Sequence, residues 1–230
     1  MNQRNSALSL LLVCQALIVA YAGVLYQSGT LGPTSISWSD VAFDAVPGAS
    51  AEQSAFVGAR FNVDSQAVTV RIGGHFAAHP NSVTDKFFGA IIRLSGSTDL
   101  PDSENLSTPD VLGATTLSFT SPSSVAFGDL SLILRPGWYA VVFGSGLFGS
   151  DQFAVGAAIR NGQDAGSPSC IAWPPGLGWF DAQALFPGSF ENNYFVVEGN
   201  YIPEPSSLSL ALLAAAAILA AAGNKSLRAR

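Results

Sequence analysis

The chain has 230 residues, of which 11% are charged, and its 10 basic and 16 acidic side chains give a net charge of −6. This length suits one large domain or two small ones, and low charge without low hydrophobicity argues against a disordered chain and against long amphipathic helices. Residues 23–202, taken as the body, contain six basic and fifteen acidic residues, and the resulting charge of −9 argues against a nucleic-acid partner.

The first 22 residues have the order of a secretory signal peptide. A short polar start containing Arg4 precedes Ala7–Ala20, a run of 14 mostly apolar residues, and Ala20 and Ala22 supply the small residues of an A-x-A cleavage site. As a helix this run would span about 21 Å, less than the roughly 30 Å hydrocarbon core of a bilayer. We predict a signal helix cleaved after Ala22; the alternative is an uncleaved signal anchor.

Cleavage at that site would remove Cys14 and leave Cys170 as the one cysteine of the mature chain. No intrachain disulfide is then possible, and a 180-residue body can bury a sufficient core without one. We expect Cys170 to be a small buried residue, with an exposed thiol as the alternative.

The body contains short β-rich runs separated by turn residues and shows no sustained helical periodicity. Apolar and polar residues alternate over Val68–Ile72, which predicts a half-buried strand, with both valines facing inward. Phe87–Leu94 is mostly apolar and predicts a strand covered on both faces. Trp138–Phe143 follows a Pro-Gly turn as the densest apolar strand, with Trp138 as a core residue. The nine candidate strands lie within Ile36–Phe43 (with a bulge), Ala55–Phe61, Val68–Ile72, Phe87–Leu94, Thr115–Phe119, Leu130–Leu134, Trp138–Phe143, Phe153–Ile159 and Tyr194–Val197.

Nine short strands with turn-rich links predict an all-β body built as a two-sheet β-sandwich, with a jelly-roll order as one candidate arrangement. An α/β fold would need helices between the strands, and these links contain none. The predicted organisation is a signal peptide at 1–22, the sandwich body at 23–202, and a C-terminal segment at 203–230. A signal helix and a C-terminal apolar helix would therefore flank the sandwich.

Three features that could carry chemistry are better explained as loops. Gly144–Gly149 matches G-x-G-x-x-G, but no helix follows to bring amides to a pyrophosphate, so a Gly-rich hairpin loop is predicted. His75 and His79 are placed at a strand end and a loop edge, not on one helix face. The acidic stretch Asp99–Asp110 is interrupted by Pro101 and fits no known calcium loop. We therefore predict no metal site and no cofactor.

Glycoside hydrolysis needs two carboxylates about 5–10 Å apart in one cleft. Asp181, Glu191 and Glu198 could supply such a pair, although a body with fifteen acidic residues always offers some pair. No G-x-S-x-G motif is present. We expect a protein without enzymatic activity and without catalytic residues, and keep a small secreted hydrolase acting on polysaccharide as the alternative.

Cys170–Phe180 is the most suggestive stretch of the body. Trp173 and Trp179 flank a Pro-Pro-Gly turn, which can hold two flat aromatic faces rigidly. Such faces suit sugar rings, whose C–H faces are apolar while their rims form hydrogen bonds. Trp173, Trp179 and Phe180 are therefore candidate glycan contacts. The alternative is that both indole rings cover the end of the core, because Trp is highly buried on average.

The C-terminal segment has the order proline break, apolar run, basic end. Pro203-Glu204-Pro205 would stop a strand or helix arriving from the body, and Leu208–Ala222 is apolar except for one serine. Residues 206–223 would span about 27 Å as a helix, near the lower limit for crossing a bilayer, with the basic end on the cytoplasmic side. The basic residues of that end are Lys225, Arg228 and Arg230.

This order resembles the PEP-CTERM sorting signal of Gram-negative bacteria over Ile202–Arg230. The resemblance implies recognition and cleavage by an exosortase, an integral-membrane cysteine protease, in an organism that makes extracellular polysaccharide. The basic end departs from the family because it reads Lys-Ser-Leu-Arg-Ala-Arg instead of a denser arginine run. A plain C-terminal membrane anchor is the alternative.

The body also resembles a type of β-sandwich often found ahead of this signal, including carbohydrate-binding ones. The likeness lies in Phe56–Phe61, Gly73–Phe76 and Leu134–Gly144, and it implies a fold and not a ligand. Together these features predict an exported cell-surface or extracellular-matrix protein with an adhesive, glycan-binding or structural role. Its partners would be the Sec translocon and signal peptidase, the exosortase, the inner membrane transiently, and a neutral polysaccharide, since the acidic body would repel an acidic one.

Overall fold

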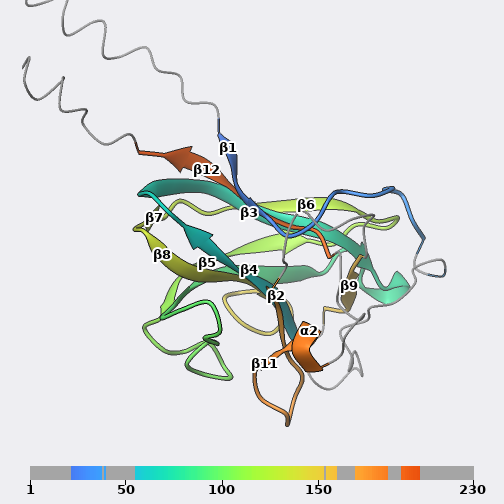
Figure 1. Ribbon diagram of the computed structural model, residues 1–230. Helices are drawn as coiled ribbons and strands as arrows, with labels where there is room; N and C mark the ends of the chain where they lie inside the picture. The colour runs from blue at the N-terminus through green and yellow to red at the C-terminus, as the bar shows by residue number, and fades with distance from the viewer. Residues whose placement is uncertain are drawn as a thin grey trace, which may run out of the picture.

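The structure is a computed structural model that describes residues 22–37, 39, 55–152, 154–159, 169–185 and 193–202. Two antiparallel six-stranded sheets pack against each other, which confirms the predicted two-sheet, all-β body (Figure 1). The first sheet contains β1 (Gly23–Gln27), β3 (Ala67–Ala78), β6 (Ser124–Asp129), β7 (Ile133–Leu134), β9 (Gly156–Ala158) and β12 (Phe195–Tyr201). The second sheet contains β2 (Phe56–Val63), β4 (Lys86–Leu94), β5 (Val111–Ser118), β8 (Gly137–Gly144), β10 (Ser169–Trp173) and β11 (Phe180–Asp181). One 3-10 turn, η2 (Pro80–Ser82), and one helical turn, α2 (Ala182–Leu185), complete the described elements.

The main strands pair as a nested set. β1 pairs with β12, β2 with β8, β3 with β6, and β4 with β5. The strand orders are β1-β12-β3-β6 in the first sheet and β11-β10-β2-β8-β4-β5 in the second. The first and last strands are therefore neighbours, with Gly23 opposite Gly199, so the chain enters and leaves the sandwich at one end of the first sheet.

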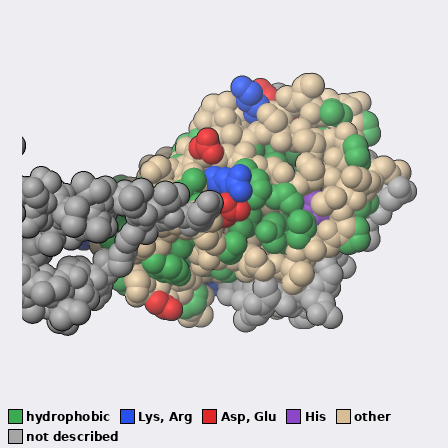
Figure 2. Space-filling model, turned by 90° about the horizontal axis from the view of Figure 1, so that it is seen from above, with side chains coloured by type: hydrophobic (Ala, Val, Ile, Leu, Met, Phe, Trp, Pro, Cys, Tyr) green, Lys and Arg blue, Asp and Glu red, His purple; other side chains and the backbone are tan. Residues whose placement is uncertain are grey.

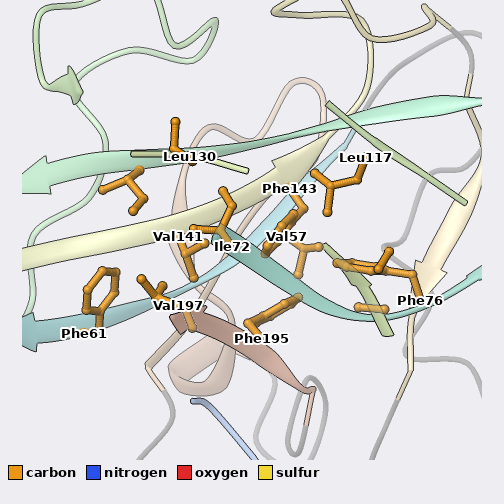
Figure 3. Close-up of a cluster of buried hydrophobic side chains, with 14 of the residues drawn as sticks. Val57, Phe61, Ile72, Phe76, Leu117, Leu130, Val141, Phe143, Phe195 and Val197 are labelled. Atoms are coloured by element: carbon orange, nitrogen blue, oxygen red, sulfur yellow. The ribbon is translucent and has the colours of Figure 1, made fainter. Parts of the chain in front are cut away.

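An aromatic core fills the space between the sheets (Figure 3). Phe76 on β3 meets Phe143 on β8 edge-to-face across the two sheets, with ring centroids 5.0 Å apart. Phe143 in turn stacks on Phe195 of β12 at 5.3 Å. Such ring pairs add about 0.5–1.5 kcal/mol beyond the burial of their area. The sheets are thus held together by ring contacts that only their face-to-face packing can form.

The second sheet is also covered on its outer face. Only Lys86 and Arg93 are exposed among the nine residues of β4, which confirms the predicted strand with two buried faces. The loop between β4 and β5 supplies Leu100 and Leu106 to this outer layer. The buried members of this layer, which we call the outer cluster, are Phe56, Phe88, Ala90, Ile92, Leu94, Leu106, Ala140, Val142 and Ile171.

The alternation predicted for Val68–Ile72 is wrong at its centre. Thr69 is buried and Val70 is exposed, the reverse of the prediction. Glu198 pairs with Arg71 and Gly199 with Thr69, so Val70 is the extra residue of a β-bulge. The buried Thr69 hydroxyl donates to the carbonyl of Leu130 and accepts from the amide of Leu132, which satisfies it.

The prediction of Trp138 as a core residue is also wrong. Trp138 is partly buried against the outer cluster, whereas the next residue, Tyr139, belongs to the core between the sheets. Adjacent strand residues face opposite sides, so one position of register exchanges the two environments. The Tyr139 hydroxyl also donates to the carbonyl of Arg135 at 2.6 Å, which fastens the turn before β8.

Some strands lie elsewhere than predicted. β1, β6, β10 and β11 were not predicted, and the run over Leu130–Leu134 forms only the two-residue β7. Ile36 is not in a strand: its carbonyl accepts from the amide of Ser123, its amide donates to the Ser123 hydroxyl, and its side chain packs on Ala77 and Ile159. Trp38 and residues 40–54 lie outside the described part. Apart from β11, which pairs with the nearby β10, these short elements are stabilised by partners distant in sequence, which local patterns do not reveal.

Cys170 is fully buried in the core, as predicted. Within the described ranges, no helix is long and apolar enough to cross a membrane. Both predicted flanking helices fall in 1–21 and 203–230, outside those ranges.

Replacing Phe143 with alanine should lower the free energy of unfolding by about 3–5 kcal/mol, the usual cost of truncating a core aromatic. Trp138→Ala is the matched control on the same strand and should cost clearly less, because Trp138 is only partly buried. Urea denaturation of both variants measures the difference. A larger loss from Trp138→Ala would contradict the observed assignment of the two faces of β8.

Candidate ligand groove

A hairpin formed by β10 and β11 carries the predicted aromatic residues. Trp173 lies opposite Phe56 of β2, and Ala172 lies opposite Phe180 of β11. The loop between the two strands is shaped by its residue types: prolines restrict the chain at its start, and the glycines that follow adopt positive φ, +83° at Gly176 and +73° at Gly178. Residues other than glycine rarely adopt a positive φ. The prolines and glycines together therefore give this loop one well-defined path.

Phe56 lies beneath both indole rings. Trp173 stacks on it with ring centroids 4.9 Å apart and an interplanar angle of 22°, and Trp179 is tilted against it at 5.9 Å. The Trp179 Nε1 donates to the carbonyl of Ser103 at 2.9 Å, which joins the hairpin to the loop between β4 and β5. Both rings are half-buried, so each uses part of its surface for packing and retains part for solvent.

The structure separates the three aromatic residues that the sequence had grouped. Trp173 lines an open groove of about 450 Å³, whereas Trp179 is not among the groove-lining residues. Phe180 packs against the core between the sheets, because it occupies the next position along the chain and therefore the opposite face. Of the three, only Trp173 is in a position to meet a ligand in this groove.

Three loops and the start of β2 converge to form the groove. One is the hairpin, one joins β4 to β5, and the third is the Gly-rich loop after β8. That third loop makes a turn and starts no helix, so the predicted Gly-rich loop at Gly144–Gly149 is confirmed, but it is not a hairpin, because β8 lies in the second sheet and the next strand, β9, pairs with β3 in the first. Its part in a groove was not predicted. The groove-lining residues are Phe56, Glu104, Asn105, Ser145, Gly146, Leu147, Gln152, Trp173, Pro175 and Gly176.

Packing holds these loops in place. Leu106 and Phe148 have positive φ, +51° and +53°, a conformation that costs bulky residues of order 1–3 kcal/mol. Leu106 is buried in the outer cluster, and the Phe148 ring meets Phe88 edge-to-face at 5.2 Å. These contacts offset the energy cost of the positive φ angles. The positions of the loops that form the groove are therefore determined by their packing on the sheet beneath them.

The acidic residues between β4 and β5 shape their own loop. Asp99 Oδ2 accepts from the backbone amide of Ser95 at 2.6 Å and from its hydroxyl at 2.7 Å. These hydrogen bonds lower the pKa of Asp99. Asp110 Oδ2 accepts from the amide of Asp102 at 3.0 Å. No three His, Cys, Asp or Glu side chains among the described residues gather in a way that could hold a metal ion.

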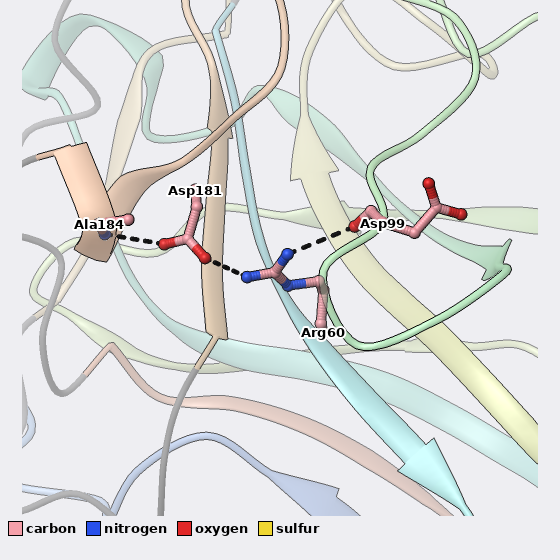
Figure 4. A network of polar contacts seen from close by, with 4 residues as sticks. All are labelled: Arg60, Asp99, Asp181 and Ala184. Atoms are coloured by element: carbon pink, nitrogen blue, oxygen red, sulfur yellow. Dashed lines mark hydrogen bonds and ion pairs between the residues drawn. The ribbon is translucent and has the colours of Figure 1, made fainter.

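Arg60 joins the hairpin to the neighbouring loop (Figure 4). Its side chain is 4% exposed, forms an ion pair with Asp181 of β11, and donates to the carbonyl of Asp99 at 3.4 Å. The other carboxylate oxygen of Asp181 accepts from the amide of Ala184 at 2.9 Å and begins α2. One buried arginine on β2 therefore positions the hairpin and the acidic loop together.

The structure does not bring the proposed hydrolase carboxylates together. Asp181 lies in the second sheet and is paired with Arg60. Glu198 lies in the first sheet, where it forms two hydrogen bonds with Arg71, at 2.7 and 3.2 Å. Glu191 is outside the described residues.

The two histidines occupy different environments. His75 was placed at a strand end, but β3 continues to Ala78 and His75 is fully buried, with Nε2 2.9 Å from the Ser123 hydroxyl. His79 Nδ1 accepts from the amide of Asn81 at 3.2 Å and caps η2.

The predicted sorting residues mostly fall outside the described part of the chain. Ala20, Pro203-Glu204-Pro205 and the basic end belong to the undescribed ranges, while Ala22 is exposed directly before β1. No family model matches the chain, and no match is found among the curated proteins or the solved structures.

Asp181→Ala should lower the free energy of unfolding by about 2–3 kcal/mol, because it leaves Arg60 buried without a counter-charge. This is less than a fully buried pair would cost, since the Asp181 side chain is 34% exposed. Glu198→Ala is the matched control: its partner Arg71 is 42% exposed, so we expect about 1 kcal/mol or less. Urea denaturation compares them, and equal losses would exclude a special role for Arg60.

Proposed function

We propose that the protein is an exported, exosortase-processed component of the cell surface or extracellular matrix, and that its groove binds a neutral glycan. The proposed export and processing rest on the signal-peptide pattern at 1–22 and on the proline, apolar and basic order of 203–230. In the precursor, a signal helix and an apolar helix flank the sandwich. The signal peptide is removed after Ala22, and the exosortase acts at the C-terminal segment.

We further propose that the sandwich is a jelly roll. Eight strands form four nested pairs, and these pairs divide between the sheets as β1-β12-β3-β6 and β2-β8-β4-β5. A ribbon of nested antiparallel pairs wrapped into two sheets produces this order. β10 and β11 extend the second sheet beyond β2, and they carry the hairpin of the groove. The extension is thus the part of the fold that serves binding.

The groove beside Trp173 is the observation that carries the glycan proposal. Its volume of about 450 Å³ lies in the range of small-ligand sites. Trp173, Pro175 and Leu147 offer apolar surface suited to the C–H face of a sugar ring. Asn105, Gln152 and Glu104 offer donors and acceptors for hydroxyl groups at the same place. An apolar plane beside amide and carboxylate groups is the chemistry that a sugar ring requires.

The carboxylates favour binding over hydrolysis. Glu104 is the one acidic residue among the described residues that line the groove, and glycoside hydrolysis uses two. The charge of −9 on residues 23–202 favours a neutral polymer over an acidic one. A single site of this kind would bind with a roughly millimolar dissociation constant, and useful retention would come from repeated display along a polymer.

Trp173→Ala should weaken retention on insoluble neutral glycans by about 5- to 30-fold, since stacking on one aromatic ring contributes about 1–2 kcal/mol. Leu177→Ala is the matched control, because Leu177 is 72% exposed at the tip of the same hairpin and does not line the groove. Trp179→Ala is expected mainly to lower the stability of the protein, since the Trp179 indole donates a hydrogen bond to the Ser103 carbonyl. If folded Trp173→Ala is retained as well as the parent protein, the glycan proposal is wrong.

Replacing Pro203-Glu204-Pro205 with alanines should trap the precursor in the inner membrane, because the motif that the exosortase would recognise is lost. Membrane fractionation and intact-mass measurement in the native host follow the outcome. The parent protein should lack the residues after the motif, and the variant should retain them. Normal cleavage and export of the variant would favour a simple anchor instead.

A further inference from the structure

Exposed apolar side chains gather at the end of the first sheet where the chain enters and leaves it. Ile133 is 63% exposed, Val24 52% and Tyr201 49%. Val70, exposed by the β-bulge, and Ile202 belong to the same end. We call this set, Val24, Val70, Ile133, Tyr201 and Ile202, the apolar rim.

Strand pairing places the rim at one end of the first sheet but on both of its faces, with Tyr201 on the side of the buried Ala67 and with Ile133 and Val24 on the outer side. Tyr201 pairs with Ala67, and the next residue of β3, Val68, pairs with Ile133. Val24 pairs with Glu198 on the far side of β12. Four adjacent strands at a spacing of about 4.8 Å place Val24 and Ile133 about 14 Å apart across the sheet. Figure 2, which looks down on this sheet, shows apolar side chains and only a few charged ones.

The charges around the rim nearly cancel. Arg71 and Glu198, which lie within it, are bonded to each other. The turns at this end contribute Asp64 from the β2–β3 connection and Arg135 from the β7–β8 connection, one charge of each sign. With Asp129 the surface carries a net charge of only −1, so it is neither strongly attracted to nor strongly repelled by a charged surface.

The sequence beyond this end favours a lipid bilayer as the partner of the apolar rim. The apolar run Leu208–Ala222 begins six residues after Ile202, a reach of at most about 21 Å. The first apolar run ends at Ala20, three residues before β1. An apolar segment seated in a bilayer would therefore hold the rim close to the lipid surface. Tyrosine and aliphatic side chains are the residues that settle at such an interface.

We propose that, in the membrane-anchored precursor, the apolar rim docks on the phospholipid bilayer. This inference rests on the anchoring part of the proposed function. β2 runs from Phe56 at the groove to Val63 near the rim, about 23 Å, so docking by the rim leaves the groove directed away from the membrane. Exosortase cleavage then releases a sandwich whose rim becomes free.

The test uses the full chain reconstituted in phosphatidylcholine vesicles. Cys14→Ser removes one native thiol, and Cys170 is buried. An environment-sensitive fluorophore is attached to Ile133→Cys or, as the matched control, to Val83→Cys. Val83 is also an exposed aliphatic residue, at 39%, but it follows η2 at the opposite end of β3. Lipids carrying a nitroxide near the headgroup serve as quenchers, and vesicle flotation measures anchoring.

We expect the label at residue 133 to shift its emission to the blue and to lose at least half its intensity with nitroxide lipids, while the label at residue 83 does neither. Val24→Asp, on the same outer face as residue 133, should reduce the quenching there several-fold without preventing flotation. Flotation with equal quenching at both labels, or with none, overturns the docking inference alone. Failure to float overturns the anchoring and the docking with it. A concentration-dependent blue shift at residue 133 without vesicles assigns the rim to a second copy of the chain instead, and also overturns the inference.

Discussion

The period of two along β2 is the constraint on which the core and the groove both depend. Val57 and Phe61 point between the sheets and join the aromatic core. Phe56 and Arg60 point to the outer face of the same sheet, where Phe56 supports both indole rings and Arg60 fastens the hairpin. Because a strand presents alternate residues to opposite faces, eight residues serve two layers at once. A shift of one register position would place Arg60 in the core and Phe61 under the hairpin.

The chain carries few charged residues, so each ion pair has few alternative partners. Arg60 is nearly inaccessible, so its pairing with Asp181 must offset the loss of hydration of a cation. Such a pair adds little net stability, but any arrangement of the hairpin that separates the two groups is strongly disfavoured. The same arginine holds the carbonyl of Asp99, and Trp179 holds that of Ser103, so two contacts connect the hairpin to the acidic loop. Rigid walls reduce the entropy cost of binding a ligand in such a groove.

The two proposed surfaces lie at opposite ends of β2 and would act at different stages. The apolar rim lies beside the points where the chain enters and leaves, whereas the groove lies at the start of β2. An anchored molecule could therefore dock by one end and present the other to the polymer outside the cell. After release, weak sites on many copies would act together along a polysaccharide. The nested strand order makes this possible, because it makes the first and last strands neighbours and leaves the loops that line the groove at the other end.

The sequence by itself determined the class of fold, the burial of Cys170 and the strand with two buried faces, because period-two patterns and apolar runs report local burial. It also identified the stretch that contains the groove tryptophan. Only the tertiary structure decided that Tyr139 and not Trp138 enters the core, and that Trp173, Trp179 and Phe180 have three different surroundings. Those outcomes depend on register and on partners far away in the chain: Arg60 and Asp181 are 121 residues apart. Side chains one position apart face opposite layers, so composition identified the aromatic stretch, while pairing with β2 determined which ring lines the groove.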